Sequence, residues 1–151
     1  MRTHRLILDA NLLVLFVVGR TSPHLIGRHR RVRAFSADDY DLLTRVMGAA
    51  KQIVVTPNTL TETSNLLGDM HGRFAAELRS IIEQSAELSV ASADAAHIPV
   101  FHRLGLADAV LWELASAEMP LLTVDLDLFV AASSKSPNAA VNFRHLAEQG
   151  A

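Results

Sequence analysis

The stretch Arg5-Leu6-Ile7-Leu8-Asp9-Ala10-Asn11 decides how the rest of the sequence is interpreted. A short apolar run ends at the carboxylate of Asp9, the amide of Asn11 follows, and apolar residues resume over 12–18. This order predicts a buried strand that ends at Asp9 and a helix that begins at or just after Asn11. Because open α/β sheets bind their ligands beyond the carboxyl ends of their strands, Asp9 is a candidate site residue.

The composition predicts a single domain over 1–151 with a substantial apolar core. Half of the 151 residues are hydrophobic and only 5% are aromatic, and a chain of this length buries about 70% of its unfolded surface. It contains no cysteine, which excludes disulfides and thiolate metal sites. The run at 12–18 is far shorter than the roughly 20 residues that cross a bilayer. No signal-peptide pattern is present, so we expect a cytoplasmic protein with no membrane contact.

Short apolar segments alternate with helical patterns along the chain. Further strands are expected at 53–55, 88–90, 121–124 and 139–142, and further helices at about 37–50, 57–67, 74–84, 106–117, 126–133 and 143–149. This alternation predicts an α/β fold in which helices cover both faces of a mostly parallel sheet of about five short strands. Gly19 is expected to break the first helix, and Gly68 and Gly72 to bracket a turn.

The segment at about 19–36 differs from the rest because it is basic and contains glycine and proline. Its arginines are Arg28, Arg30, Arg31 and Arg33. The planar guanidinium group suits phosphate recognition, so these residues are candidates for binding nucleic acid. A solvated loop, or a contact with another subunit, would explain the cluster as well. The net charge of −2 for the whole chain favours neither interpretation.

Glu62 and Asp108 are acids on predicted helices, at positions that are not clearly exposed. Glu62 lies four residues before Leu66, on the same side of its helix, although a solvated flank is an equal alternative. Asp108 aligns at helical spacing with Leu111 and other apolar residues. A carboxylate there is costly unless it is paired or binds a metal ion. Arg103 is the alternative, structural partner.

Asp125 and Asp127 follow the strand expected at 121–124. Helix capping by Asp125 and a favourable dipole interaction of Asp127 would explain both, just as capping would explain Asp9. If the strands before Asp9 and Asp125 are neighbours, however, both carboxylates project into one crevice. Clustered carboxylates do not all stay ionised unless a cation neutralises them. Ligation by oxygen alone favours magnesium or manganese over zinc.

Taken in order, these motifs resemble those of PIN-domain nucleases, whose best-known small members are the VapC-type toxins of bacterial toxin–antitoxin pairs. The matching segments are Leu8-Asp9-Ala10-Asn11, Thr61-Glu62, Gly105-Leu106-Ala107-Asp108-Ala109 and Leu121-Leu122-Thr123-Val124-Asp125-Leu126-Asp127. The resemblance covers nearly the whole chain. It implies a Rossmann-like three-layer α/β/α sandwich and phosphodiester cleavage that depends on Mg²⁺ or Mn²⁺, usually of RNA.

The resemblance also implies roles for individual residues. The implied catalytic acids are Asp9, Glu62, Asp108 and Asp125, of which Asp9, Asp108 and Asp125 are direct metal ligands. The implied supporting residues are Asn11, Thr123 and the accessory acid Asp127. A toxin implies an antitoxin protein as partner. The segment at 19–36 is longer and more basic than in minimal toxins, which leaves the partner open and the choice between RNA and DNA undecided.

Two other functions are compatible with the same residues. An aspartate-nucleophile phosphohydrolase would use Asp9, but haloacid-dehalogenase-like enzymes carry a second aspartate two residues later, where Asn11 stands here. A PIN-like module that keeps the fold and acts only by binding is the second alternative. The helix over 12–18 is apolar on nearly every side, which favours a homodimer.

Overall fold

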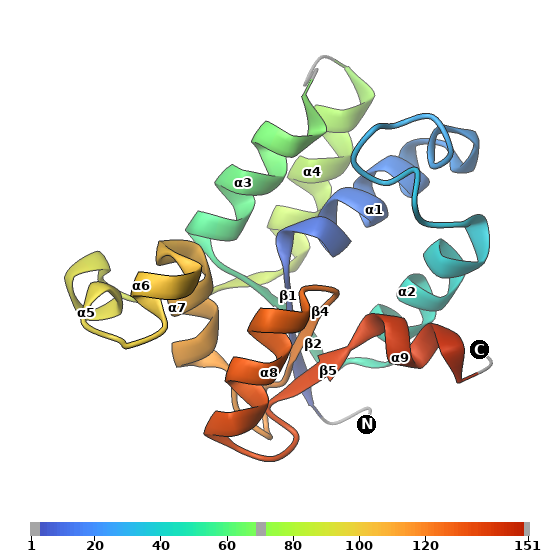
Figure 1. Cartoon of the computed structure of the whole chain (residues 1–151). Helices are drawn as coiled ribbons and strands as arrows, with labels where there is room; N and C mark the ends of the chain where they lie inside the picture. The colour runs from blue at the N-terminus through green and yellow to red at the C-terminus, as the bar shows by residue number, and fades with distance from the viewer. Residues whose placement is uncertain (1–3, 69–71, 150–151) are drawn as a thin grey trace.

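The computed structural model describes residues 4–68 and 72–149. Its strands are β1 (Arg5–Leu8), β2 (Gln52–Val55), β3 (Ala86–Glu87), β4 (Leu121–Thr123) and β5 (Ala140–Asn142). They form one sheet in the order β3-β2-β1-β4-β5, and every pair of neighbours is parallel (Figure 1). The predicted α/β fold with a parallel sheet of five short strands is confirmed.

Helices cover both faces of this sheet (Figure 1). They are α1 (Ala10–Thr21), α2 (Ala37–Ala49), α3 (Pro57–Leu67), α4 (Arg73–Gln84), α5 (Ser92–Ala96), α6 (Phe101–Leu104), α7 (Leu106–Leu114), α8 (Leu126–Lys135) and α9 (Phe143–Glu148), with the 3₁₀ turn η1 at Pro23–Leu25. Leu6 and Leu8 of β1 pack into the core formed with α1 to α4, whereas Ile7 packs toward α7 and α8. This alternation along one strand gives a Rossmann-like three-layer sandwich.

The strand order places a topological switch point between β1 and β4. The chain passes from β1 outward to β2 and β3, and then returns to the other side of β1 to form β4 and β5. In open α/β sheets the crevice for ligands lies outside the carboxyl ends of the strands at such a point. Asp9 follows β1 and Asp125 comes two residues after β4, so both lie at this crevice.

The helix α1 is enclosed by its own chain. Residues 12–19 are all buried, and α1 contacts α2, α3, α4 and η1. This packing accounts for the apolar sequence of the helix without a second copy, so the homodimer stays a prediction. In the described part of the chain, no helix combines the length and the hydropathy needed to cross a membrane.

Two expectations about α1 were wrong. The helix begins at Ala10, before the predicted start at or just after Asn11, and Asp9 is its N-cap, because Asp9 Oδ1 accepts a hydrogen bond of 2.7 Å from the amide of Ala10. The helix also continues through Gly19 to Thr21. A Cβ atom at Gly19 would lie 2.3 Å from Cδ1 of Tyr40 on α2, so glycine is needed there for close packing rather than as a helix breaker.

We expect Gly19→Ala to lower the free energy of unfolding by about 1–3 kcal/mol, because the added methyl group displaces the Tyr40 ring. Urea denaturation of both proteins measures the difference. Gly48→Ala is the matched control, since Gly48 lies in α2 and a Cβ atom there meets nothing within 4 Å. It should raise stability by up to about 1 kcal/mol through helix propensity. Equal shifts in the two variants would contradict the close packing at Gly19.

The helices α2 and α3 both begin at caps that are local in sequence. Ser36 and Asp39 form a capping box at the start of α2. Thr56 caps α3 through the amide of Thr59, and Pro57 is the first residue of the helix.

Some predicted boundaries shift for reasons of tertiary packing. The strand β3 lies at Ala86–Glu87 instead of 88–90. The amide of Leu88 still donates to the carbonyl of Val55 at 2.9 Å, whereas Val90 packs in the separate cluster of Ala95, Ala109 and Val110. The helix α7 ends at Leu114 instead of 117, and α8 extends to Lys135 instead of 133. Gly68 and Gly72 have φ angles of 81° and 64°; the predicted turn between them includes residues 69–71, which lie outside the described residues.

A lysine fastens the carboxyl ends of α7 and α8 to each other. Lys135 Nζ donates to the carbonyl oxygens of Trp112, Glu113 and Ala115 at 2.7, 2.7 and 3.0 Å. It lies 4.6 Å from the centre of the Trp112 ring, whose Nε1 donates to the carbonyl of Ala131 at 3.1 Å. Partial burial lowers the pKa of Lys135. These contacts hold in place the two helices whose first turns carry Asp108 and Asp125.

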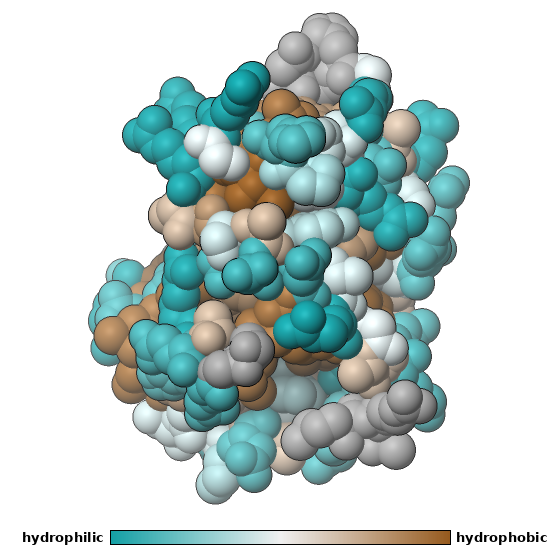
Figure 2. Space-filling model, turned by 90° about the vertical axis from the view of Figure 1, so that its right-hand side faces the viewer, coloured by the Kyte–Doolittle hydropathy of each residue, from teal (hydrophilic) through white to brown (hydrophobic). Residues whose placement is uncertain are grey.

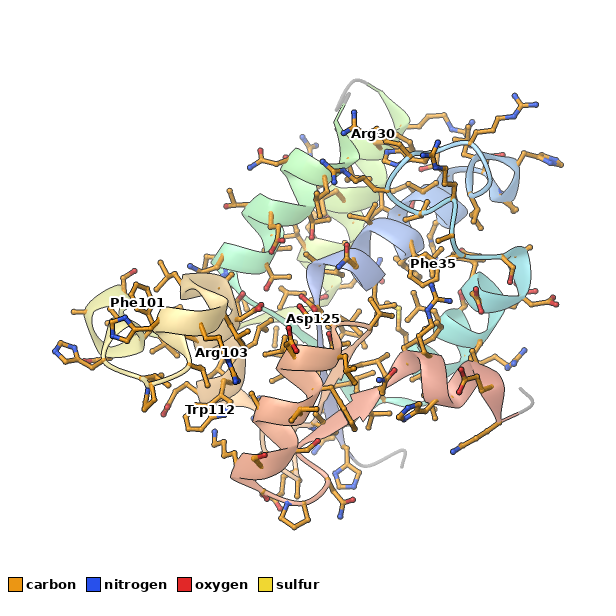
Figure 3. All side chains as sticks on the ribbon, in the orientation of Figure 1. Arg30, Phe35, Phe101, Arg103, Trp112 and Asp125 are labelled. Carbon is orange, nitrogen blue, oxygen red and sulfur yellow. The ribbon has the colours of Figure 1, made fainter. Side chains whose placement is uncertain are left out.

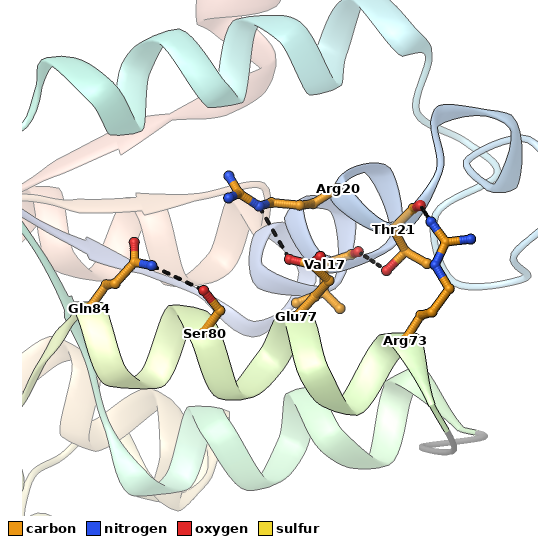
Figure 4. A network of polar contacts seen from close by, with 7 residues as sticks. All are labelled: Val17, Arg20, Thr21, Arg73, Glu77, Ser80 and Gln84. Carbon is orange, nitrogen blue, oxygen red and sulfur yellow. Dashed lines mark hydrogen bonds and ion pairs between the residues drawn. The ribbon is translucent and has the colours of Figure 1, made fainter.

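Polar contacts join α4 to α1 on the opposite face of the sheet (Figure 4). Arg20 Nε lies 3.2 Å from Glu77 Oε2, and the side chain of Arg73 donates to the carbonyl of Thr21.

Between α2 and α9, the sheet is left partly open. An apolar cavity of about 400 Å³ lies there, lined by Leu6, Leu122 and other residues, and hydrophobic surface is visible among hydrophilic residues on this side (Figure 2).

Candidate metal centre

One buried hydroxyl connects the two strand ends at the switch point. Because β1 and β4 are neighbours, the amide of Asp9 donates to the carbonyl of Leu122 at 3.2 Å. Thr123 Oγ1 donates to Asp9 Oδ2 at 2.7 Å and accepts from the amide of Asp125 at 3.0 Å. Thr123 therefore fixes both the carboxylate of Asp9 and the start of α8.

Asp9 and Asp125 are helix caps and also keep free acceptor capacity. The side chain of Asp9 is 6% exposed and accepts one hydrogen bond on each oxygen, from Ala10 and Thr123. Asp125 caps α8 by accepting from the amide of Leu128 at 3.1 Å. A carboxylate has about four lone-pair sites, so each residue retains unused acceptor positions. Capping and a second role in the crevice are therefore compatible.

Asp108 and Glu62 reach the same crevice from two helices. Gly105, with a φ angle of 92°, precedes α7, and Asp108 lies half-buried in its first turn. Burial raises the pKa of Asp108 to about 7, with further contributions from the charges of Asp9, Asp125 and Glu62. Burial and the charge of Asp9 also raise the pKa of Glu62, which is accessible to solvent. The structure thus places the four predicted acids within range of one another's charge.

The pKa of Asp9 responds to opposing influences. Desolvation by burial raises it most, the hydrogen bonds from Thr123 and Ala10 lower it, and the charge of Asp125 raises it. Together these influences raise the pKa of Asp9 above its ordinary value.

Arg103, the alternative structural partner of Asp108, is exposed on α6, and no ion pair in the described part of the chain joins the two residues.

Other predicted site residues lie apart from this group of acids. Asp127 is exposed in the first turn of α8, and its charge is not among those that raise the pKa of Asp108. Asn11 is half-buried in the first turn of α1. Arg30 lies at the opposite end of α1 from Asp125 (Figure 3). At about 1.5 Å per residue, the 12 residues of α1 span about 18 Å.

The basic segment is anchored by its apolar residues while its arginines remain exposed. Ile26, Val32 and Phe35 are buried, and His29 Nε2 lies 3.0 Å from the carbonyl of Leu67. The exposed arginines are Arg28, Arg30, Arg31 and Arg33. The segment therefore presents its charge from an ordered surface, about one helix length away from the acids.

The four acids form a group of interacting charges, but they do not stand in a finished ligand geometry. Among residues 4–68 and 72–149, no three Asp, Glu or His side chains are arranged so that they could hold a metal ion. Asp9 and Asp125 are held in place by their hydrogen bonds. The donor set of oxygens alone fits Mg²⁺ or Mn²⁺.

We expect Thr123→Val to lower the free energy of unfolding by about 1–3 kcal/mol, because it leaves Oδ2 of the buried Asp9 without a donor. The loss should be larger at pH 8 than at pH 5, since the hydroxyl favours the ionised form of Asp9. Urea denaturation at both pH values measures this. Thr123→Ser is the control, because it retains the hydroxyl. A loss independent of pH in the valine variant would contradict the assigned hydrogen bond.

A cavity of about 600 Å³ that was not predicted from the sequence lies beside Glu62. Asn58 and Asn65 of α3 line it together with Leu104 and Leu106. The signal available in the sequence was the helical spacing of Asn58, Glu62 and Asn65 after Pro57, which puts all of them on one face. That the two leucines stand opposite to this face depends on contacts between α3 and α7, which the sequence does not reveal.

Comparisons with known proteins support the fold and go no further. No family model matches the chain, and no curated protein sequence matches it. The crystal structure of PAE2754 from Pyrobaculum aerophilum is similar, with a TM-score of 0.54 and 18% sequence identity. The similarity covers 99% of this chain and 96% of that one. At this identity the likeness establishes that the two chains share the Rossmann-like α/β arrangement.

Proposed function

We propose that the chain is a divalent-metal-dependent phosphodiesterase, an endoribonuclease that acts in the cytoplasm as the toxin of a toxin–antitoxin pair. The observation that carries the proposal is the junction of Asp9, Thr123 and Asp125 at the switch point, with Asp108 and Glu62 facing it. Burial and neighbouring carboxylates raise the pKa of Asp9, Glu62 and Asp108, and the resulting surplus of negative charge is one that a cation would neutralise. The resemblance to PIN-domain nucleases specifies the reaction.

Each residue has a task in this proposal. Asp9, Asp108 and Asp125 would hold Mg²⁺ or Mn²⁺, which supplies charge neutralisation at the phosphate and a lowered pKa for bound water. Thr123 keeps the Asp9 carboxylate in one orientation through its hydrogen bond. Glu62, which is accessible and has a raised pKa, accepts a proton from the attacking water on its carboxylate.

The arginine cluster extends the proposed substrate contact. Arg28, Arg30, Arg31 and Arg33 would bind the phosphate backbone of the nucleic acid beyond the cleavage point, so that affinity falls as salt concentration rises. The distance of about 18 Å along α1 requires a strand of several nucleotides to contact both the arginine cluster and the acids.

An antitoxin protein and a second copy of the chain are the proposed protein partners.

Of the two alternatives, the binding module has an observation in its favour. In the described residues no three acids stand ready as metal ligands, which is also what a module acting by interaction alone would present. The phosphohydrolase is disfavoured, because Asp9 is 6% exposed and both of its oxygens accept hydrogen bonds. A nucleophile needs an accessible oxygen.

A cleavage assay on pooled RNA and single-stranded DNA tests the proposal. We expect RNA to be cleaved in millimolar Mg²⁺ or Mn²⁺, and the activity to disappear with EDTA and return when metal is added. Expression in a bacterial host should arrest growth if the chain is a toxin, and Asp108→Asn should relieve the arrest. Binding of RNA without cleavage under any metal condition would favour the binding module.

A further inference from the structure

The cavity of about 600 Å³ between α3 and the start of α7 is open to solvent and is lined by one of the four acids, Glu62. Glu62 belongs to its lining, and so does Ala107, the residue before Asp108. A molecule bound in this cavity would therefore lie beside Glu62, one of the four acids of the candidate metal centre.

The wall that α3 contributes is polar and carries two amides. Asn58, Glu62 and Asn65 follow one another at intervals of four and three residues, which places them on one face of the helix. Each asparagine presents both a donor and an acceptor. The described lining contains no lysine or arginine, so the cavity offers no cation to a phosphate group.

The facing wall is apolar. Leu104 at the end of α6 and Leu106 at the start of α7 are both half-buried and line the cavity. Gly105 separates them, and its φ angle of 92° turns the chain between the two helices. The cavity thus combines an apolar wall with a wall of amides.

A planar ring with an apolar face and a hydrogen-bonding edge matches both walls. A nucleobase has this chemistry, and asparagine amides are able to read base edges. A base within a duplex has its faces stacked and its edge paired, whereas an unpaired base exposes both. We propose that this cavity binds one unpaired nucleobase of the substrate next to the cleaved phosphodiester, and that Asn58 and Asn65 discriminate among the bases. The inference rests on the proposed nuclease function.

The first experiment maps cleavage positions in a pool of random single-stranded RNA with Mg²⁺. The natural chain should show unequal base use at one position beside the cut. Asn58→Leu and Asn65→Leu should reduce this discrimination about tenfold and retain cleavage, because leucine keeps the size of the side chain and removes its hydrogen bonds. Gln84→Leu on α4 is the matched control for loss of an exposed amide, and it should keep the full preference.

The second experiment measures binding in EDTA and does not depend on cleavage. Fluorescence anisotropy with labelled homopolymers of each base, in RNA and in DNA form, should show a preferred base in the natural chain. Both asparagine variants should lose about tenfold in affinity for that base. The salt dependence should stay unchanged, because the described lining of the cavity carries no cationic side chain.

The outcomes separate this inference from the nuclease function. Cleavage with the same base preference in the natural chain and both asparagine variants overturns the base site and leaves the nuclease intact. A preference in binding that the variants lose, without cleavage by any protein, supports the base site and overturns the nuclease. Equal affinity for duplex and single-stranded RNA overturns the base site.

Discussion

Asp108→Asn is expected to reduce metal-dependent RNA cleavage by at least about 100-fold, since removing even an outer partner of a metal ligand costs 10–100-fold. Asparagine retains the shape of the side chain and removes the charge. Asp108 is half-buried and carries a pKa of about 7, raised by burial and by Asp9, Asp125 and Glu62. The measurement is the initial rate of cleavage of a labelled RNA at saturating Mg²⁺.

Asp41→Asn serves as the matched control for this loss, because Asp41 is exposed on α2, and the same change of charge there should leave the rate unchanged. Raising the Mg²⁺ concentration should not restore Asp108→Asn fully. If the asparagine variant cleaved RNA at the natural rate, Asp108 would have no part in the reaction and its raised pKa would be a consequence of burial alone.

The second large effect is on stability, and its sign depends on pH. The folded pKa of Asp108, about 7, is above the ordinary value of 3.8. Between these values the folded state binds more protons than the unfolded state, so stability falls as pH rises through this window. In EDTA at pH 8, Asp108→Asn should therefore be more stable than the natural chain by roughly 1–2 kcal/mol, a figure reduced for solvent screening. At pH 4 the two should be nearly equal.

Mg²⁺ should reverse this order. A ligand that binds only the folded state, at a concentration 100 times its dissociation constant, adds about 2.7 kcal/mol to the free energy of unfolding by mass action. The natural chain should gain this stabilisation at pH 8, and the asparagine variant much less. Thermal melts of both proteins, with and without Mg²⁺ at both pH values, give the eight melting temperatures needed. Equal metal-induced shifts in the two proteins would contradict a shared metal site.

Asp9→Asn is a less direct test of the same repulsion. Asp9 caps α1 and accepts the hydrogen bond of Thr123, so an amide nitrogen would replace one of its two acceptors. The loss of a hydrogen bond would then offset the relief of charge repulsion. Asp108 has no capping role in the structure, which makes its substitution easier to interpret.

Local patterns in the sequence were sufficient for the fold class and for the position of most elements. The capping box at Ser36 and Asp39 and the pair Thr56-Pro57 concern residues within one helical turn, so their signals are readable from the chain itself. The carboxylates of Asp9 and Asp125 were predicted at strand ends for the same reason. Capping alone explains an acid at each of these places, and the common crevice was expected only if the two strands are neighbours.

Only the tertiary structure decided which of these residues meet. The hydrogen bond from Thr123 to Asp9 joins residues 114 positions apart and requires β1 and β4 to be neighbours. Other contacts also depend on distant segments packing together. Gly19 lies against Tyr40, Lys135 donates to the carbonyl of Ala115 at the end of α7, and two leucines line the cavity opposite α3. Periodicity reports which side of an element is apolar, but not which element covers it. The sequence by itself therefore determined the elements and their order, whereas the packing of distant segments determined the site.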